Sequence, residues 1–286
     1  MTTVLPTRGP MLHPRITVLV RPNGAVQLGW DPEHAVILQP PGPIEAVPAL
    51  LRLLDGSRTE AEILWQAREL GFGTDIAQSL LEQMAAAELL AADEPRARLR
   101  KVRVHGRGPL ADALLDGLRR IGLRAKHSHA RYGEPGIESL EADRPDLLVL
   151  SDTLVPDPAL VAALMRRRIP HLQVRIRDGR GIVGPLVLPG ETGCLRCADL
   201  YRAESEPAWP QLAAQLLGRV GYASPAAVAM TGALALKEIE TVSFGRAEHP
   251  PATLHATLEL DPEIPHLDRR PWPVHPNCGC HENAVV

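Results

Sequence analysis

Four cysteines, arranged as two close pairs, are the residues of this sequence best suited to binding a metal ion. Cys194 and Cys197 are separated by two residues, and Cys278 and Cys280 by a single glycine. Two such pairs supply the four sulfur ligands that a structural zinc ion takes in a tetrahedral site. Since sulfur would fill every ligand position, none would remain for a reactive water molecule. The pattern therefore predicts a structural zinc that joins the C-terminal tail to the body of the chain.

The residues alone leave two alternatives to this ligand set. His275 and His281 flank the second pair, and either could replace a cysteine as ligand. Four free thiols in a reduced protein are the other interpretation. Disulfides are not expected, because a cytoplasmic location is predicted and thiols stay reduced there.

A glycine-rich turn is the second feature that could bind a ligand. Gly106 and Gly108 follow an expected strand and open an expected helix, as in dinucleotide-binding and ATP-binding folds. Pro109 removes one backbone N–H from this turn. An acidic residue that binds a ribose is expected about 20 residues further on, but the segment 124–129 contains none and the next acid is Glu134. The pattern predicts the fold of a nucleotide-binding domain, and ATP itself is not expected to bind.

Asp152 directly follows the apolar run 147–150 and Ser151. The carboxyl ends of strands in open sheets are where such folds place their ligands. The same carboxylate could instead cap the turn that begins at Thr153. The residues do not decide between these roles.

Composition limits the classes of function. The chain has 286 residues and a formal charge of −3, with 45% hydrophobic and 23% charged residues. This balance is that of a globular protein and argues against binding nucleic acid through bulk charge. No apolar run reaches the roughly 20 residues that a membrane span requires, and the N-terminus lacks the apolar segment of a signal peptide. We expect no membrane or nucleic-acid partner.

From residue 101 onward, strand and helix patterns alternate. Strands are expected at 102–105, 147–150, 171–176, 180–188 and 253–260. Helices are expected at 157–168 and from the segment 106–111 to Arg120. Ser224 and Pro225 begin a long helix that should turn Ala227, Met230, Leu234 and Ile239 inward. The alternation predicts an α/β domain over 101–286, with a mostly parallel sheet and helices on both faces. The tail, 261–286, is expected to be held by the metal alone.

The first third of the chain predicts a smaller, separate domain. Residues 1–14 are expected to form a flexible arm, and 93–100 a linker. Between them, Asn23-Gly24 joins two alternating apolar runs and predicts a hairpin, followed by a third strand at 35–38. Three helical stripes come next, and the second opens with a capping box formed by Thr59 and Glu62. Residues 15–92 are therefore predicted to form a winged helix-turn-helix domain.

The second half resembles the ThiF-like adenylyltransferase superfamily. The resemblance lies in Leu150-Ser151-Asp152, the segment 171–174, and the segment 184–197, which ends in a Pro–Gly turn and the first cysteine pair. Residues 187–210, VLPGETGCLRCADLYRAESEPAWP, together with 275–280, HPNCGC, are most similar to the ThiF-like partner proteins of azole-forming YcaO cyclodehydratases. The resemblance covers roughly residues 15–283 and is weaker, mainly one of topology, in the first half.

This resemblance implies a non-catalytic scaffold. Its winged-helix domain would capture the leader of a ribosomally made peptide, and its zinc-bearing ThiF-like domain would help present that precursor to a separate YcaO-type cyclodehydratase, which heterocyclises Cys, Ser or Thr. Asp152 matches the position of the superfamily's metal-binding aspartate, but the acidic ribose ligand is not matched. The alternative is an active ATP-dependent adenylyltransferase that acts on a peptide or carrier-protein carboxylate. A third hypothesis is a stand-alone regulator that binds another peptide or protein. ThiF-like folds commonly form homodimers, so the resemblance also allows a homodimer.

Leader capture would add an extended peptide to the exposed edge of the strand at 35–38, against the third helix. The residues expected to line this groove are Val36, Ile37, Leu38, Leu80, Leu81 and Met84. The alternative is that they are ordinary core residues, and winged helices more commonly bind DNA. The third helix, however, contains no Lys or Arg, and it carries Asp75, Glu82 and Glu88. DNA binding is therefore not expected.

Overall fold

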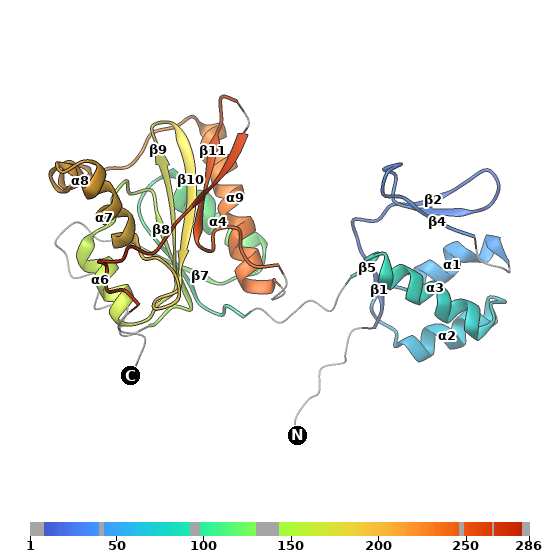
Figure 1. Cartoon of the computed structure of the whole chain (residues 1–286). Coiled ribbons are helices and arrows are strands. Elements are labelled where there is room, and N and C mark those ends of the chain that lie inside the picture. Colours follow the sequence, from blue (N-terminus) through green and yellow to red (C-terminus); the bar gives the residue numbers. More distant parts are fainter. Residues whose placement is uncertain are drawn as a thin grey trace, which may run out of the picture. The chain divides into compact units, whose positions relative to one another are not determined.

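The chain divides between Pro95 and Arg96 into two compact units. The computed structural model describes residues 9–39, 43–91, 98–129, 143–245, 249–264 and 266–281 (Figure 1). Residues 1–8 of the expected arm and 93–97 of the expected linker lie outside these ranges.

The first unit contains the expected hairpin and third strand. Strands β2 (Val18–Val20), β3 (Val26–Leu28) and β4 (Val36–Leu38) form an antiparallel sheet with β3 in the centre. The hairpin turn depends on Gly24, whose φ of +82° is a conformation that few residues other than glycine adopt readily. The side chain of Asn23 accepts a hydrogen bond from the backbone of Ala25 and stabilises the same turn.

Three helices pack beneath this sheet. They are α1 (Val47–Arg52), α2 (Glu60–Glu69) and α3 (Thr74–Ala86). The short helix η1 (Ile44–Ala46) directly precedes α1. The predicted capping box of α2 is confirmed: the Thr59 side chain accepts from Glu62 N–H, and the Glu62 carboxylate accepts from Thr59 N–H. Sheet and helices share one hydrophobic core that includes Val26, Leu28, Val47, Leu51, Ile63, Ala77 and Met84.

The third helix, which the apolar spacing predicts from about Asp75 to Leu90, ends at Ala86. Leu89 N–H bonds to Met84 O and Glu88 N–H to Ala85 O, which is the hydrogen-bond pattern of a Schellman motif. Glu88 takes the left-handed position of this motif, with φ of +54°. Because glycine is the usual residue there, the sequence carried no stop signal.

Part of the expected N-terminal arm is ordered. Strand β1 (Met11–Leu12) pairs with β5 (Leu90–Ala91) in an antiparallel ladder. Leu12 N–H also donates to Leu54 O. These backbone hydrogen bonds hold Met11 and Leu12 in place, although the sequence predicts a flexible arm there. A two-residue strand has too little periodicity to be recognised from the sequence.

The second unit is built on a seven-stranded sheet in the order β12-β11-β10-β9-β8-β6-β7. Four strands, β7, β6, β8 and β9, run parallel, and β10, β11 and β12 extend the sheet by antiparallel pairing. The strands are β6 (Val102–His105), β7 (Ala125–Ser128), β8 (Leu147–Ser151), β9 (His171–Arg177), β10 (Arg180–Val187), β11 (Ala256–Asp261) and β12 (His266–Pro271).

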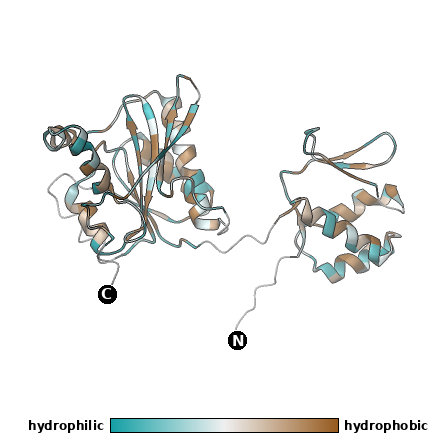
Figure 2. Ribbon diagram, viewed as in Figure 1, coloured by the Kyte–Doolittle hydropathy of each residue, from teal (hydrophilic) through white to brown (hydrophobic). Residues whose placement is uncertain are grey.

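Helices cover both faces of this sheet (Figure 1). Helices α4 (Pro109–Arg120) and α9 (Pro225–Phe244) pack together on one face. Helices α6 (Pro158–Arg166) and α7 (Leu195–Ser205) lie on the other, and α8 (Trp209–Leu216) follows α7. Hydrophobic residues concentrate along the strands and the helices beside them, as Figure 2 shows.

Helix α9 starts at the predicted cap, where the Ser224 side chain accepts from Ala227 N–H. The prediction that Met230 points inward is wrong, since this side chain is 38% exposed. The buried side of α9 instead runs through Ala227, Thr231, Ala235 and Ile239. A helix with apolar residues all around it gives no periodic signal of which face is buried.

The C-terminal tail is held by more than a metal site. Strand β12 pairs with β11 from Ala256↔Pro271 to Asp261↔His266, and Trp272 N–H donates to His255 O. The expectation that only the metal anchors residues 261–286 is therefore wrong. Sequence reasoning missed β12 because its residues are mostly polar and exposed. No described helix combines the length and apolar character that crossing a membrane requires.

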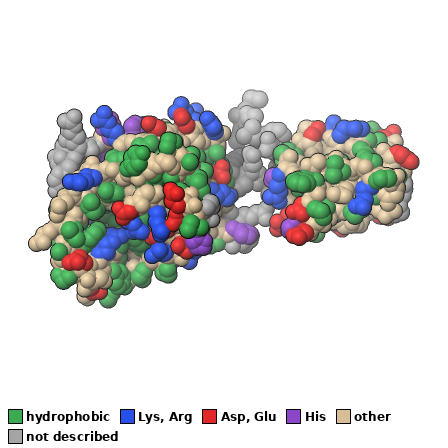
Figure 3. Space-filling model, turned by 90° about the horizontal axis from the view of Figure 1, so that it is seen from above, with side chains coloured by type: hydrophobic (Ala, Val, Ile, Leu, Met, Phe, Trp, Pro, Cys, Tyr) green, Lys and Arg blue, Asp and Glu red, His purple; other side chains and the backbone are tan. Residues whose placement is uncertain are grey.

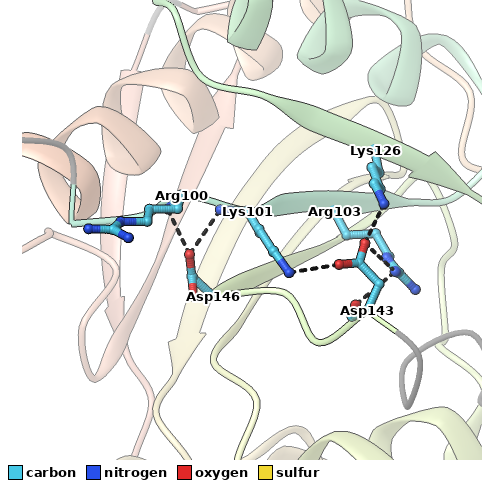
Figure 4. Close-up of polar contacts among 6 residues, drawn as sticks. All are labelled: Arg100, Lys101, Arg103, Lys126, Asp143 and Asp146. Carbon is cyan, nitrogen blue, oxygen red and sulfur yellow. Dashed lines mark hydrogen bonds and ion pairs between the residues drawn. The ribbon is translucent and has the colours of Figure 1, made fainter.

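An ion cluster fixes the start of the parallel strands (Figure 4). The Asp143 carboxylate lies 2.9 Å from Lys101 Nζ, 2.6 Å from Lys126 Nζ and 3.5 Å from Arg103 Nη2. These three cations come from β7, from β6 and from the residue just before β6. Hydrogen bonds from Lys126 and Lys101 hold the pKa of Asp143 far below its usual range.

Asp146 continues this anchor along the backbone. Its Oδ2 accepts hydrogen bonds from the backbone N–H groups of Arg100 and Lys101, at 2.6 and 2.9 Å (Figure 4). The chain that enters the second unit is thereby attached to the segment that leads into β8.

We expect Asp143→Asn to lower the melting temperature more than Asp116→Asn, whose exposed ion pair with Arg119 joins neighbouring turns of one helix. Because the folded-state pKa of Asp143 is lowered, its contribution is present above the unfolded-chain pKa of about 3.9 and is lost as pH falls through the folded-state value. The difference between parent and Asp143→Asn should thus be full near neutrality and shrink under acid conditions. Thermal melts across pH measure this, and a pH-independent difference would contradict it.

Candidate functional site

The two cysteine pairs come from segments far apart in the sequence. Cys194 is the N-terminal cap residue of α7, and Cys197 lies in its first turn. In the tail, Cys278 N–H donates to His275 O, and Gly279 has a φ of +67°. This left-handed glycine bends the chain between Cys278 and Cys280, so both thiols can face α7.

The four sulfur atoms are spaced as ligands of one ion. Sγ of Cys194 lies 3.8 Å from that of Cys197 and 3.5 Å from that of Cys278, and Sγ of Cys197 lies 3.5 Å from that of Cys280. All four lie within 4.8 Å of one another. A tetrahedron with metal–sulfur bonds near 2.3 Å has sulfur–sulfur edges of about 3.8 Å. The four cysteines therefore fit a tetrahedral metal ion.

The surroundings of the thiols differ from one cysteine to the next. Burial raises the pKa of Cys194, and it raises that of Cys278 to about 11. Burial also acts to raise the pKa of Cys197, but hydrogen bonds, led by one from the backbone of His275, lower it overall. Since metals bind the thiolate form, metal binding here should release protons.

The structure gives His275 other partners, whereas Nε2 of His281 is buried and has no hydrogen-bond partner among the described residues. His275 Nε2 lies 2.9 Å from Glu204 Oε1, and its Nδ1 accepts from Asn277 N–H at 3.1 Å. Both ring nitrogens of His275 are thus engaged away from the sulfurs. Among the described residues, the ligand group consists of the four cysteines and does not include His281.

The metal site belongs to the hydrophobic core on the α6 side of the sheet. Cys194 and Cys197 are buried with Leu148, Leu150, Leu164 and Val187. Trp272 also donates from its indole Nε1 to Cys194 O at 3.1 Å. The tail is joined to α7 by this bond as well as by the cysteines.

The glycine-rich turn lies against the end of β8. A Cβ on Gly106 would come within 2.3 Å of Ser151 O, and a Cβ on Gly108 within 2.5 Å of Asp152 Oδ1. Both positions therefore require glycine because the two segments touch. The third expected residue of this site, Asp152, supplies the contact.

Asp152 occupies the N-terminus of α4. Its Oδ1 accepts from Leu110 N–H at 2.9 Å and its Oδ2 from Ala111 N–H at 3.0 Å. The side chain is buried, and burial raises its pKa. A carboxylate is thus held by the first N–H groups of the helix, where nucleotide-binding folds hold a phosphate. One of the two predicted roles for Asp152 was to cap the turn that begins at Thr153. In the structure its side chain instead caps α4.

Most of the residues expected to line a peptide groove are buried. Leu38, Leu80, Leu81 and Met84 are 1–7% exposed and belong to the core of the first unit. Val36 is half-buried, and Ile37 is 51% exposed. Hydrophobic periodicity marks core and groove residues alike, so the sequence could not separate them.

The hydrogen-bond phase of the small sheet shows which backbone groups are free. Arg21 N–H donates to Ala25 O, and Gly29 N–H donates to Thr17 O. Because hydrogen-bonded and non-bonded pairs alternate in antiparallel sheets, the backbone of Gln27 also bonds toward β2.

The same alternation fixes the outer edge of β4. Val26 and Leu28 must bond toward β4, where their register partners are Leu38 and Val36. The backbone N–H and C=O of Ile37 therefore point away from β3, to an edge that pairs with no other described strand.

A cavity on the α6 side of the sheet was not expected from the sequence. It has a volume of about 780 Å³, and its lining includes Gln173 and Arg175 of β9. The available signal was polar residues at alternate positions of an otherwise apolar strand, His171, Gln173 and Arg175.

Comparison with known proteins identifies the fold. No protein-family model matches the chain, and no curated protein matches it significantly. Among solved structures, the heterocyclase TruD superposes with a TM-score of 0.64 at 17% identity, covering 96% of this chain and 42% of that one. A heterocyclase in complex with substrate and cofactor gives 0.64 at 18% identity, with 98% and 40% coverage. The microcin C7 biosynthetic enzyme MccB, in complex with N-formylated MccA, gives 0.60 at 10% identity, with 95% and 99% coverage.

These proteins share a fold with the present chain at low identity. The second unit fits the ThiF-like adenylyltransferase fold that the sequence motifs predicted. The chain spans about two fifths of the length of the two heterocyclase chains.

We expect Cys194→Ser to abolish stoichiometric metal binding and to lower the melting temperature by roughly 10 °C, because losing one buried ligand releases the ion. Cys278→Ser should do the same from the other segment. The double variant should be little worse than either single one, because each alone already removes the metal.

Metal content by inductively coupled plasma mass spectrometry and thermal melts measure these effects. His275→Ala is the matched control: it removes a neighbouring side chain that is bonded to Glu204, and metal content should stay unchanged. Retained metal in Cys194→Ser, or its loss in His275→Ala, would contradict the four-cysteine site.

Proposed function

We propose that this protein is a non-catalytic scaffold in the biosynthesis of ribosomally made, azole-containing peptides. Its first unit, a winged-helix domain in this proposal, binds the leader of the precursor peptide. Its second unit helps present the precursor to a separate YcaO-type cyclodehydratase, which heterocyclises Cys, Ser or Thr residues. The protein acts in the cytoplasm, where the four cysteine thiols stay reduced.

The open edge of β4 is the observation that carries this proposal. The backbone N–H and C=O of Ile37 face that edge, and the Ile37 side chain is 51% exposed. An extended peptide can pair with such an edge and place alternate side chains on either face of the sheet. The buried residues Leu38, Leu80, Leu81 and Met84 keep the strand and the third helix in place.

The exposed face of the small sheet is also suited to binding apolar side chains of a peptide. Leu19 and Ile37 lie on one face of the sheet, on either side of Gln27, and are 39% and 51% exposed. Figure 3 shows hydrophobic side chains among scattered charges on the visible face of this unit, without a basic patch there. A peptide strand added next to β4 would extend the apolar row.

The superposition on the TruD heterocyclase covers 96% of this chain and 42% of the TruD chain, whereas the superposition on MccB covers 99% of MccB. In this proposal a separate YcaO-type cyclodehydratase supplies the ATP-dependent chemistry. Asp152 supports a non-catalytic second unit, because its carboxylate already uses the N–H groups at the start of α4.

Zinc is the metal that we propose for the four cysteines. Four thiolates in a tetrahedron are its typical structural site, and a filled coordination shell leaves no place for catalysis. In this role the metal stabilises the second unit and fixes the tail against α7.

An active adenylyltransferase is the second candidate function. The Gly106–Gly108 turn between β6 and α4 favours it, because this is the strand–turn–helix arrangement of nucleotide-binding folds. The Asp152 carboxylate would have to leave the helix N-terminus before a phosphate could bind there.

We expect Ile37→Pro to weaken binding of a fluorescently labelled precursor leader by at least about tenfold, because an added strand loses one backbone hydrogen bond and meets the proline ring. The variant keeps the bonds between β3 and β4, since Ile37 N–H points away from β3. Fluorescence anisotropy measures the affinity. The leader is taken from a precursor that the host encodes together with a YcaO-type cyclodehydratase.

Val18→Pro is the matched control. By the same alternation its N–H faces the opposite open edge of the sheet, so the substitution is equivalent but placed on β2. This variant should bind the leader as tightly as the parent, and residues 96–286 alone should not bind. Equal losses in both proline variants, or leader binding by the second unit alone, would refute capture at β4.

We further expect no ATP–pyrophosphate exchange above the blank, with or without a precursor peptide, because the helix N-terminus is filled by Asp152. Asp152→Ala should leave the rate at that level. Exchange at an enzyme-like rate that disappears in Asp152→Ala would favour the adenylyltransferase instead.

A further inference from the structure

The cavity in the second unit lies on the face of the sheet that α6 and α7 cover. Its volume is about 780 Å³. Strand β9 contributes its floor, α6 and α7 contribute walls, and Trp272 with the second cysteine pair closes one side. Helix α4 lies on the other face of the sheet, and neither α4 nor the glycine-rich turn lines the cavity.

Two polar side chains on the floor of this cavity have unused hydrogen-bond donors. Gln173 and Arg175 are 2% and 6% exposed, and they lie on the same face of β9. Within the described part of the chain, Nε2 of Gln173 and Nε of Arg175 have no hydrogen-bond partner. Arg175 is held in position by a bond from its Nη1 to Leu154 O at 2.9 Å.

Buried donors without partners carry a free-energy cost, so such groups usually mark a bound water, ion or ligand. Here both donors line one cavity and sit two residues apart along one strand. An acceptor with two oxygen atoms could receive a hydrogen bond from each.

The charges around the floor favour an anion. Arg202 is paired with Asp199 at 3.1 Å, and Trp209 Nε1 donates to the same carboxylate. This pair is neutral, and Arg175 forms no ion pair of its own with a described residue. Burial, helped by the charges of Arg202 and Arg177, lowers the pKa of Arg175 to about 9, so the guanidinium stays charged near neutrality.

The walls of the cavity combine apolar side chains with arginines. Val161 and Met165 of α6, Leu195 of α7, and Pro189 and Trp272 line it, and so do Arg166, Arg168 and Arg196. A ligand that fills this volume must therefore carry an apolar body as well as an anionic group.

We propose that this cavity binds the carboxylate of a ligand with an apolar body, with Arg175 and Gln173 as the carboxylate-binding residues. A carboxylate has the two coplanar oxygens and single charge that these donors match. Inorganic phosphate matches less well, because it has no apolar body to contact Val161, Met165 and Leu195. The carboxylate could belong to a small organic acid or to the C-terminus of a peptide.

This site is separate from leader capture, which the first unit performs in the proposed function. It also differs from the metal site in its binding groups. Cys194, Cys278 and Cys280 line one side of the cavity, but the metal ligands are the four cysteine sulfurs, whereas Arg175 and Gln173 bind the carboxylate. The proposal therefore stands or falls independently of leader capture.

The test measures binding of four probes to the full chain with its metal bound, by isothermal titration calorimetry. The probes are octanoate, N-acetyl-leucyl-phenylalanine as the free acid, the same dipeptide as its amide, and inorganic phosphate. Binding of octanoate alone assigns the site to small acids. Binding of the peptide acid, with at least about tenfold weaker binding of the amide, assigns it to a peptide terminus.

Two variants place the binding in the cavity. Arg175→Met removes the guanidinium and should weaken the bound acid by at least about tenfold. Ala162→Trp introduces a large side chain at an exposed position of α6 that lines the cavity, and it should block binding while leaving Arg175 in place. This second variant keeps the test decisive if Arg175→Met does not fold.

Ala159→Trp and Arg120→Met are the matched controls. Ala159 is an exposed residue of the same helix that does not line the cavity, and Arg120 is exposed at the end of α4. Both should bind the acid like the parent. In the parent, the Arg175 Nε–H resonance should shift on titration.

Three results would overturn the proposal. They are no binding of either acid, tighter binding of phosphate than of both acids, and unchanged affinity in both Arg175→Met and Ala162→Trp. Failure of leader capture at β4 would leave each of these measurements unaffected.

Discussion

The carboxylate of Asp152 at the N-terminus of α4 joins the end of β8 to the glycine-rich turn, where a nucleotide-type fold has its anion site. The first N–H groups of a helix attract anions, and in this fold they are the groups that would receive a phosphate. Asp152 supplies an anion from the chain itself, bonded at 2.9 and 3.0 Å to Leu110 and Ala111. Gly106 and Gly108 bring their turn so close to Ser151 and Asp152 that even a Cβ would collide. A phosphate could enter only if this contact opened.

The polar groups of the opposite face are a second chemically distinctive part of this unit. The face under α4 and α9 is covered by an apolar core with Leu110, Leu114, Val174 and Ile239. The face under α6 and α7 holds the four cysteines and the Arg175 cavity. One sheet thus separates an apolar layer from a layer that carries four clustered cysteines and the unpartnered donors of Gln173 and Arg175.

In the first unit, the residues that stabilise the fold are likewise separate from those that could bind a ligand. Its helices and the inward side of β3 and β4 bury a continuous set of aliphatic residues. Leader binding, as proposed, uses groups outside that core: the backbone N–H and C=O of Ile37, which point away from β3, and its exposed side chain. A strand edge offers the same hydrogen bonds to any sequence, so leader specificity would come from side chains beside it.

The sequence by itself determined the elements with strong local signals. The Thr59 capping box, the Asn23-Gly24 hairpin and the Ser224 cap all formed where their residues predicted, because each depends on bonds within a few residues. The two cysteine pairs also indicated a joint metal site, since few other arrangements use such spacing. Local patterns did not reveal β12, β1 or the end of α3 at Glu88, which have weak periodicity or an unusual residue at a key position.

Tertiary structure alone decided which of the candidate residues could meet a ligand. It put Asp152 on the N-terminus of a helix more than forty residues earlier in the chain, engaged His275 with Glu204, and buried Leu80, Leu81 and Met84 in the core. It also placed Gln173 and Arg175 in a cavity closed by helices and by the tail. The physical reason is the same in each case: a side chain's type and spacing fix what it could bind, but its partners come from segments that only the folded chain brings into contact.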